Sequence, residues 1–195
     1  MGAKIMKQFQ QRLRASKITA AFLILGMLAQ GCAAVEDRRF GQVATDAEIR
    51  LDINKRALNG KNQDLFFDLK TNVYEGRVML TGAVKAAANR TRIAGLAKGI
   101  PGVQTIYNDV QVTDAGGFKN TANDTWIKTK VNSQLLAENG VNSANYQTRV
   151  VNSVIYIIGR ALSQHEFGKV LTIAKRIEHV TKVVHHIDVR AQTTK

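Results

Sequence analysis

The sequence predicts an α+β fold that is built twice, as two tandem small domains. Each domain is expected to order its elements as helix, strand, strand, helix and strand. The first observation behind this prediction is an internal repeat: residues 73–82 (VYEGRVMLTG) recur 77 positions later as residues 150–159 (VVNSVIYIIG). The second is the order of hydrophobic periods, which passes from helical to alternating and back at matching places in both copies.

Residues 1–31 are predicted to be a secretory signal peptide rather than part of the fold. Five bases and no acid precede the apolar run 18–29, and small residues follow it. A basic region, an apolar core of about a dozen residues and a small-residue junction are the parts of a signal peptide. An uncleaved membrane anchor is the alternative, but the charge-free stretch 18–35 is marginal for crossing a bilayer.

The segment 28–32 (LAQGC) resembles the bacterial lipobox, in which the cysteine is lipidated and becomes the mature N-terminus. Cys32 is the only cysteine, so the chain is expected to form no disulfide. A multiply acylated Cys32 would hold the protein durably on a membrane, with residues 32–44 as the tether. Ala33 follows the cysteine, and by resemblance to lipoprotein sorting this favours the periplasmic face of the outer membrane.

Charge narrows the class of partner. The leader holds five of the 28 bases and none of the 15 acids, so the chain after residue 31 carries a net charge of +8 rather than +13. A basic surface suits nucleic acid or an anionic membrane. Export argues against nucleic acid, which leaves phospholipid head groups or another acidic envelope component as the expected partner.

The first repeat spans residues 45–112, and a linker over 113–122 separates it from the second. Glu75-Gly76 is a hairpin-turn signal, and Pro101-Gly102 separates the second helix from the last strand. The expected elements are a helix over 46–58, strands over 65–74 and 77–84, a helix over 86–98 and a strand over 103–112.

The second repeat spans residues 123–195 and takes its boundaries from cap and turn signals. These signals are Asn123-Asp124 as a helix cap, Asn139-Gly140 as a helix stop, Asn152-Ser153 as a hairpin turn and Ser163 with Glu166 as a capping box. The expected elements are a helix over 125–138, strands over 146–151 and 154–160, a helix after Ser163 and a strand over 183–190. Because each repeat is near the lower size limit for folding unaided, the two are expected to pack on each other.

Glycine motifs recur at fixed places in both copies. The second strand of each hairpin closes with apolar-x-apolar-x-Gly, at 78–82 and 155–159, and Gly102-Val103 precedes the last strand of the first repeat. With the element order, these motifs resemble the BON domain, and two such domains behind a lipobox are similar to dual-BON outer-membrane lipoproteins. The resemblance implies two helices on one face of a small three-stranded sheet. It also implies binding to anionic phospholipid, enrichment at division sites, support of envelope integrity and no catalysis.

The first helix of the second repeat differs from its counterpart in the first repeat. At 100° per residue, its core-facing side chains are Ile127, Val131 and Leu135. Trp126 lies roughly 140° from the centre of that face, and Leu136 lies about as far away on the other side. The position that matches Trp126 in the first repeat is Glu48, so the two copies have diverged here.

A tryptophan beside lysines suits a membrane surface, because the indole is apolar yet carries a hydrogen-bond donor. A lysine near an anionic surface contributes about 1 kcal/mol. The sequence therefore predicts a phospholipid-binding surface made of Trp126, Lys128, Lys130, Ser133, Leu136 and Ala137. The alternative is that Trp126 and Leu136 are buried between the two domains.

No residue pattern predicts catalysis, a cofactor or a metal site. His185 and His186 are adjacent on a strand, so they are expected to point to opposite faces and cannot hold one ion together. The chain contains no G-x-S-x-G, no Cys–His pair and no phosphate-cradling glycine loop. Two functions remain: a lipid-anchored phospholipid-binding protein, or a protein-interaction adaptor for envelope assembly or cell-wall remodelling machinery.

Overall fold

The computed structural model describes residues 38–62, 65, 69–114 and 121–190. Both repeats belong to one compact unit that spans Val35–Lys195. The predicted signal peptide, the lipidation site Cys32, the first part of the tether and most of the linker lie outside the described residues.

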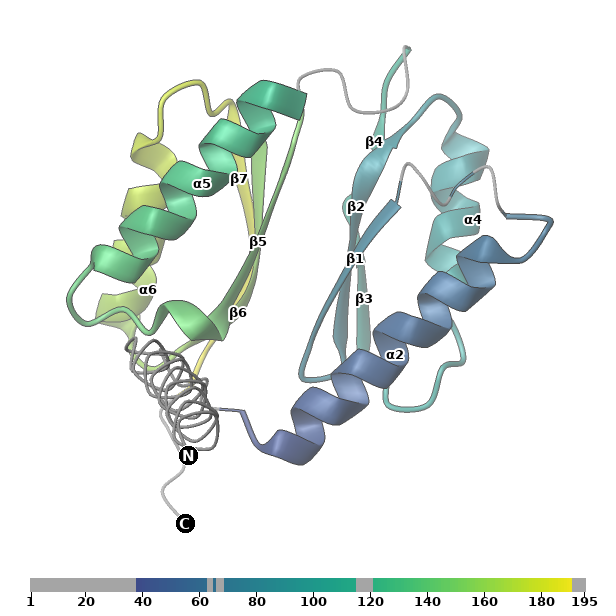
Figure 1. Cartoon of the computed structure of the whole chain (residues 1–195), viewed down its shortest axis with the longest axis horizontal. Helices are drawn as coiled ribbons and strands as arrows, with labels where there is room; N and C mark the ends of the chain where they lie inside the picture. Colours follow the sequence, from purple (N-terminus) through teal and green to yellow (C-terminus); the bar gives the residue numbers. More distant parts are fainter. Residues whose placement is uncertain (1–37, 63–64, 66–68, 115–120, 191–195) are drawn as a thin grey trace, which may run out of the picture. The chain divides into compact units, whose positions relative to one another are not determined.

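The first repeat has the predicted α+β architecture. Its strand β1 (Leu69–Tyr74) runs antiparallel to β2 (Arg77–Val84), which is parallel to β3 (Thr105–Asn108) and to the short β4 (Gln111–Val112). The helices α2 (Phe40–Leu58) and α4 (Ala87–Ala97) cover the same face of this sheet (Figure 1). Their buried residues form one core with alternate residues of β2.

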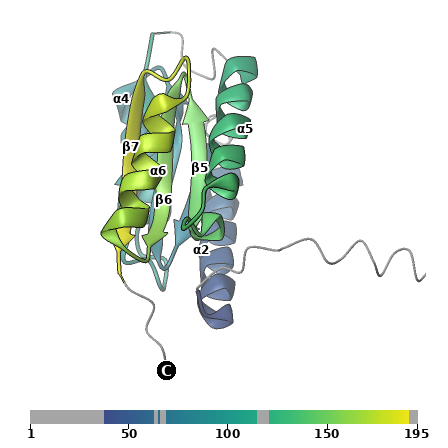
Figure 2. The same ribbon diagram turned by 90° about the vertical axis from the view of Figure 1, so that its left-hand side faces the viewer.

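The second repeat has the same architecture. The elements are α5 (Thr121–Ala137), a single 3-10 turn η1 (Ser143–Asn145), β5 (Tyr146–Val151), β6 (Val154–Ala161), α6 (Gln164–Arg176) and β7 (Lys182–Val189). The sheet order is β5-β6-β7, with an antiparallel hairpin and a parallel third strand. Helices α5 and α6 lie on one face of this sheet (Figure 2).

The capping box at the start of α6 differs in detail from the prediction. Ser163 is the N-cap, and its side chain accepts a hydrogen bond from the Glu166 N–H. The Glu166 carboxylate does not accept the reciprocal hydrogen bond from the Ser163 backbone N–H that a capping box contains. It is buried and accepts instead from the backbone N–H groups of Leu162 and Asn142, so it ties α6 to the loop after α5.

The predicted cap of the first helix in the second repeat is wrong. Helix α5 begins at Thr121, so Asp124 lies within the first turn of the helix rather than at the N-cap position. Its two carboxylate oxygens accept hydrogen bonds from the backbone N–H groups of Asn152 and Ser153, both at 2.8 Å. The aspartate therefore binds a distant hairpin turn instead of its own helix.

The first repeat makes the same contact. The carboxylate of Asp46 accepts from the N–H groups of Glu75 and Gly76, at 2.6 and 2.8 Å. Asp46 lies in the second turn of α2, since this helix begins at Phe40, six residues earlier than predicted. Both turns have positive φ at their two central residues, as type I′ hairpin turns require. A buried carboxylate thus fixes the first helix of each repeat to the hairpin.

The two repeats pack through the sheet faces that the helices leave uncovered. The residues of this shared cluster are Tyr74, Met79, Ala83, Val151, Tyr156 and Ile158. The members of this cluster on β2 and β6 alternate with residues that face the helices, because successive strand side chains point to opposite faces. The expected packing of the repeats on each other is confirmed.

Equivalent positions of the repeats meet across this interface. Arg149 Nε donates to Asn72 Oδ1 at 2.9 Å, and His186 Nε2 lies 2.7 Å from Asp109 Oδ2. Each pair joins residues that are 77 positions apart, the offset of the internal repeat. Pairing of a position with its own counterpart is the mark of an isologous, approximately two-fold interface.

We predict that Asp124→Asn lowers the free energy of unfolding by about 2–3 kcal/mol, because one of the two accepting oxygens becomes an NH2 donor that faces a turn N–H group, and the negative charge is lost. The measurement is urea denaturation followed by circular dichroism. The matched control is Asp52→Asn, which removes only an exposed ion pair with Lys55 and should cost less than about 1 kcal/mol. Equal losses in the two variants would contradict a special role for the buried carboxylate.

Candidate functional site

Helix α5 buries one face and leaves the opposite face to solvent. Asp124, Ile127, Val131 and Leu135 are buried, which agrees with the core-facing side expected for this helix. Trp126 is 38% exposed and Leu136 is 66% exposed. The alternative that these two side chains are buried between the repeats is therefore wrong.

The indole of Trp126 is held in place by neighbours of its own repeat. The His179 ring meets it edge-on, with centroids 5.7 Å apart. The Lys130 ammonium lies 5.7 Å from the centre of the indole ring, within the range of a cation–π interaction. Ser133 and Ala137 continue this exposed stripe along the helix. An apolar ring and a positive charge are thus presented to solvent together.

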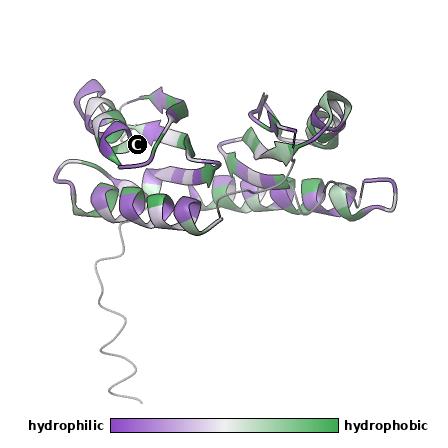
Figure 3. Ribbon diagram, turned by 90° about the horizontal axis from the view of Figure 1, so that it is seen from above, coloured by the Kyte–Doolittle hydropathy of each residue, from purple (hydrophilic) through white to green (hydrophobic). Residues whose placement is uncertain are grey.

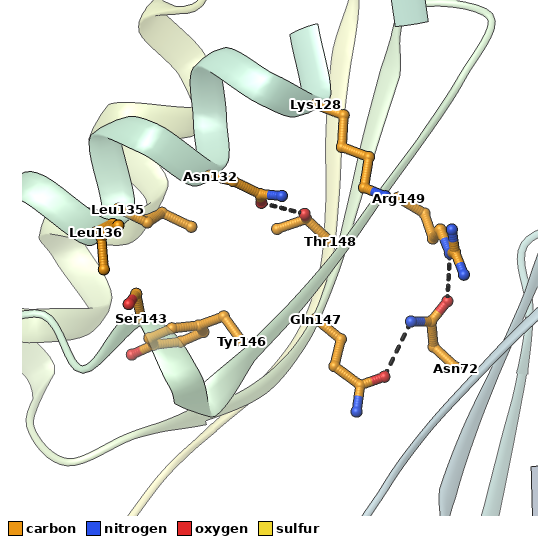
Figure 4. A pocket seen from close by; sticks show the side chains of 10 residues that line it. All are labelled: Asn72, Lys128, Asn132, Leu135, Leu136, Ser143, Tyr146, Gln147, Thr148 and Arg149. Carbon is orange, nitrogen blue, oxygen red and sulfur yellow. Dashed lines mark hydrogen bonds between the residues drawn. The ribbon is translucent and has the colours of Figure 1, made fainter. Parts of the chain in front are cut away.

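Lys128 lies on the other flank of α5. It is half-buried and lines a pocket of about 460 Å³ between α5 and β5, with Leu136 at the rim (Figure 4). The six predicted lipid-binding residues therefore form two groups. Trp126, Lys130, Ser133 and Ala137 share one stripe, whereas Lys128 and Leu136 border the pocket.

The pocket wall reaches into the first repeat. Asn72 of β1 accepts from Arg149 and donates from Nδ2 to Gln147 Oε1 at 2.9 Å, while Gln147 donates to the carbonyl of Val73 at 3.0 Å (Figure 4). These bonds hold the Arg149 guanidinium beside Lys128 at the junction of the two repeats.

Positive charge gathers around this junction. A second pocket of about 380 Å³ is lined by Lys70, Lys128 and Arg149, together with the Asp124 carboxylate that the hairpin turn already engages. Burial lowers the pKa of Arg149, and the positive charge of Arg50 on α2 lowers it further. Sequence reasoning missed Arg50, Lys70 and Arg149, because their proximity depends on how the two repeats pack.

The two adjacent histidines point to opposite faces of β7, as predicted. The His185 ring packs edge-on against Phe167 of α6, with centroids 5.3 Å apart. The His186 ring stacks on Tyr107 of the first repeat at 3.7 Å. Across residues 38–62, 65, 69–114 and 121–190, no three His, Cys, Asp or Glu side chains come close enough to bind a metal ion.

No helix within the described part of the chain combines the length and apolar character needed to cross a membrane.

One family model and several known proteins match this chain. The family model described as BON domain matches residues 45–114 and 123–191. A protein of Anaplasma centrale, known as an uncharacterized protein in the gshII 5' region, is 32% identical over 73% of this chain and 93% of its own length. Outer membrane lipoprotein DolP of Haemophilus influenzae is 29% identical over 57% of each chain. Osmotically-inducible protein Y of Escherichia coli is 25% identical over 88% of this chain and 94% of that protein.

Acid should destabilise the fold in part through His185. Burial lowers the pKa of this imidazole, and the charges of His186 and Lys175 add to the effect. As the pH falls below about 6.5, the unfolded chain therefore binds the proton before the folded chain does, and the free energy of unfolding decreases. The decrease ends once the pH has passed the lowered folded-state pKa.

We predict that His185→Gln flattens this decrease, measured as urea midpoints between about pH 7 and pH 5. His165→Gln, at an exposed position on α6, is the control and should leave the pH dependence as it is. An unchanged slope in His185→Gln would contradict the assignment.

Proposed function

Because this chain belongs to the BON-domain family, we propose that it is a non-catalytic envelope protein, anchored through Cys32 on the periplasmic face of the outer membrane, that binds anionic phospholipid. The name of the relative DolP, an outer membrane lipoprotein, supports this location. The proposed role is support of outer-membrane integrity, with enrichment at division sites as the BON resemblance implies.

The observation that carries the proposal is the exposed indole beside an ammonium group on α5. Tryptophan is enriched at the boundary between membrane and water, where its ring is buried while the indole N–H stays hydrated. Each nearby lysine adds about 1 kcal/mol on an anionic surface. This contact is weak and reversible by itself. It becomes effective because an acyl anchor already confines the protein to the membrane.

We predict that Trp126→Glu weakens binding of residues 33–195 to phosphatidylglycerol vesicles by about tenfold or more, since it replaces an inserted ring with a repelled charge. Trp126→Phe should retain most of the binding. Thr172→Glu adds the same charge at an exposed position on α6 and serves as the matched control. If folded Trp126→Glu binds as wild type does, the proposal fails. Recovery of a protein partner through this helix, without any response to lipid, would then favour the adaptor.

We predict that the full chain incorporates labelled palmitate and that Cys32→Ser abolishes this labelling, because Cys32 is the only thiol in the sequence. Cell fractionation should recover the wild-type protein with the membranes and the Cys32→Ser variant in the soluble fraction. Leu28→Val, a conservative change in the same motif, is the control. Palmitate labelling that persists in Cys32→Ser would contradict the anchor.

A further inference from the structure

Helix α2 of the first repeat carries an apolar stripe that faces solvent. Phe40 is 89% exposed, Leu51 53% and Leu58 51%. At 100° per residue these three side chains fall within about 20° of one another. The exposed Ala44 and Ala47 lie within about 40° of the same line.

This stripe is separate from the face that packs on the sheet. The buried residues of α2 are Asp46, Ile49, Ile53 and Ala57. The exposed stripe is centred about 140° away from them around the helix. Single exposed apolar residues are common, whereas an aligned row on one helix marks an interaction surface.

Exposed apolar side chains are concentrated on two helices. Within the described part of the chain, the exposed large hydrophobic residues are Phe40, Leu51, Leu58, Val112, Trp126 and Leu136. All except Val112 belong to α2 or α5, which are the first helices of the two repeats. The apolar surface is therefore shared between equivalent elements rather than scattered.

Helices α2 and α5 lie along the same side of the two sheets. Two perpendicular views agree on this placement (Figures 2 and 3). Arg149 of β5 lines a pocket together with Lys128 of α5, and the positive charge of Arg50 on α2 contributes to lowering the pKa of the same Arg149. One flat surface laid against this side of the molecule would therefore contact both helices.

The charge of this side fits an anionic surface. Arg50, Lys70, Lys128 and Arg149 come from four different elements and surround the junction between the helices. Arg39 and Lys55 of the α2 region are exposed as well, and the nearby acids are the exposed Glu48 and the Asp52 that pairs with Lys55.

A head-group phosphate between Arg50 and Arg149 would offset the repulsion between these guanidinium groups. A second copy of this chain would bring the same cations together, so a bilayer fits better than a self-association partner.

We propose that α2 is the second half of the membrane-docking surface. Helices α2 and α5 lie together on an anionic bilayer, with head-group phosphates between Arg50, Lys128 and Arg149. This inference extends the proposed function, which assigns lipid contact to α5 alone. The anchor supports it, because Phe40 is only eight positions after Cys32, and an extended chain spans at most about 28 Å over that length.

The test uses the full acylated chain in phosphatidylglycerol-containing vesicles. With Cys32 acylated, an introduced cysteine is the only free thiol and can carry a nitroxide spin label. The labelled variants are Leu51→Cys, Leu136→Cys and the control Thr172→Cys on α6. Collision with oxygen reports contact with lipid, and collision with a water-soluble nickel chelate reports exposure to water.

We expect the label at position 51 to lose accessibility to nickel and gain accessibility to oxygen, while position 172 stays in water. Position 51 in water with position 136 in lipid would overturn this inference and leave the proposed function standing. Both positions in water would overturn this inference, and unchanged vesicle binding by Trp126→Glu would overturn the proposed function as well. Position 51 in lipid with position 136 in water would contradict joint docking of the two helices, and the Trp126→Glu measurement would then decide the proposed function of α5. Spin–spin broadening at position 51 would indicate a second copy and overturn the inference.

Because Leu51 is exposed, its replacement should leave the fold intact, which circular dichroism checks. As a second measurement, Leu51→Glu with Leu58→Glu should return a label at position 136 toward water. An unchanged depth at position 136 would contradict joint docking of the two helices.

Discussion

The hydrogen bonds between one buried carboxylate and a hairpin turn fix the geometry of each repeat. Asp124 must point inward to reach the N–H groups of Asn152 and Ser153. This contact sets the rotation of α5 about its own axis. Trp126 is two residues further on, which is about 200° around the helix, so it must point outward. Asp46 sets α2 in the same way and leaves Leu51 in solvent. A structural contact in the core thus decides which side chains are available to a partner.

The interface between the repeats contains buried polar groups that need specific hydrogen-bond partners. Arg77 is nearly buried, donates to the carbonyls of His186 and Gly159 and pairs with Asp188 at 3.2 Å. Buried polar groups of this kind cost several kcal/mol when they lose their partners, so they specify one packing of the two sheets. The same packing brings Arg50 and Arg149 together. The cationic junction is therefore a product of the interface and belongs to neither repeat alone.

The sequence predicted the elements well where local chemistry determines them. Strands 146–151 and 77–84 and both hairpin turns agree with the structure, because alternation and turn residues act over short range. Helix starts were less accurate: the Asp124 side chain was expected to cap its own helix, but tertiary contacts claim it. The available signal was that Asp46 and Asp124 occupy equivalent places, 78 positions apart, each three residues before a buried isoleucine. Helical angles placed Trp126 correctly in solvent. Arg149 could not be found, since nothing local shows that a strand residue will meet Lys128 and Asn72.

Pairing of equivalent positions across the sheets has a consequence for how the copies can differ. Two separate identical chains that joined through these faces would carry the same residue at both matching sites, so every change would occur twice. When the two repeats are joined in one chain, each repeat can change independently of the other. Glu48 and Trp126 occupy matching places on α2 and α5, yet one is an acid and the other an indole. Joining the halves in a single polypeptide keeps the pseudo-symmetric contact of a homodimer while it allows the outer helices to specialise.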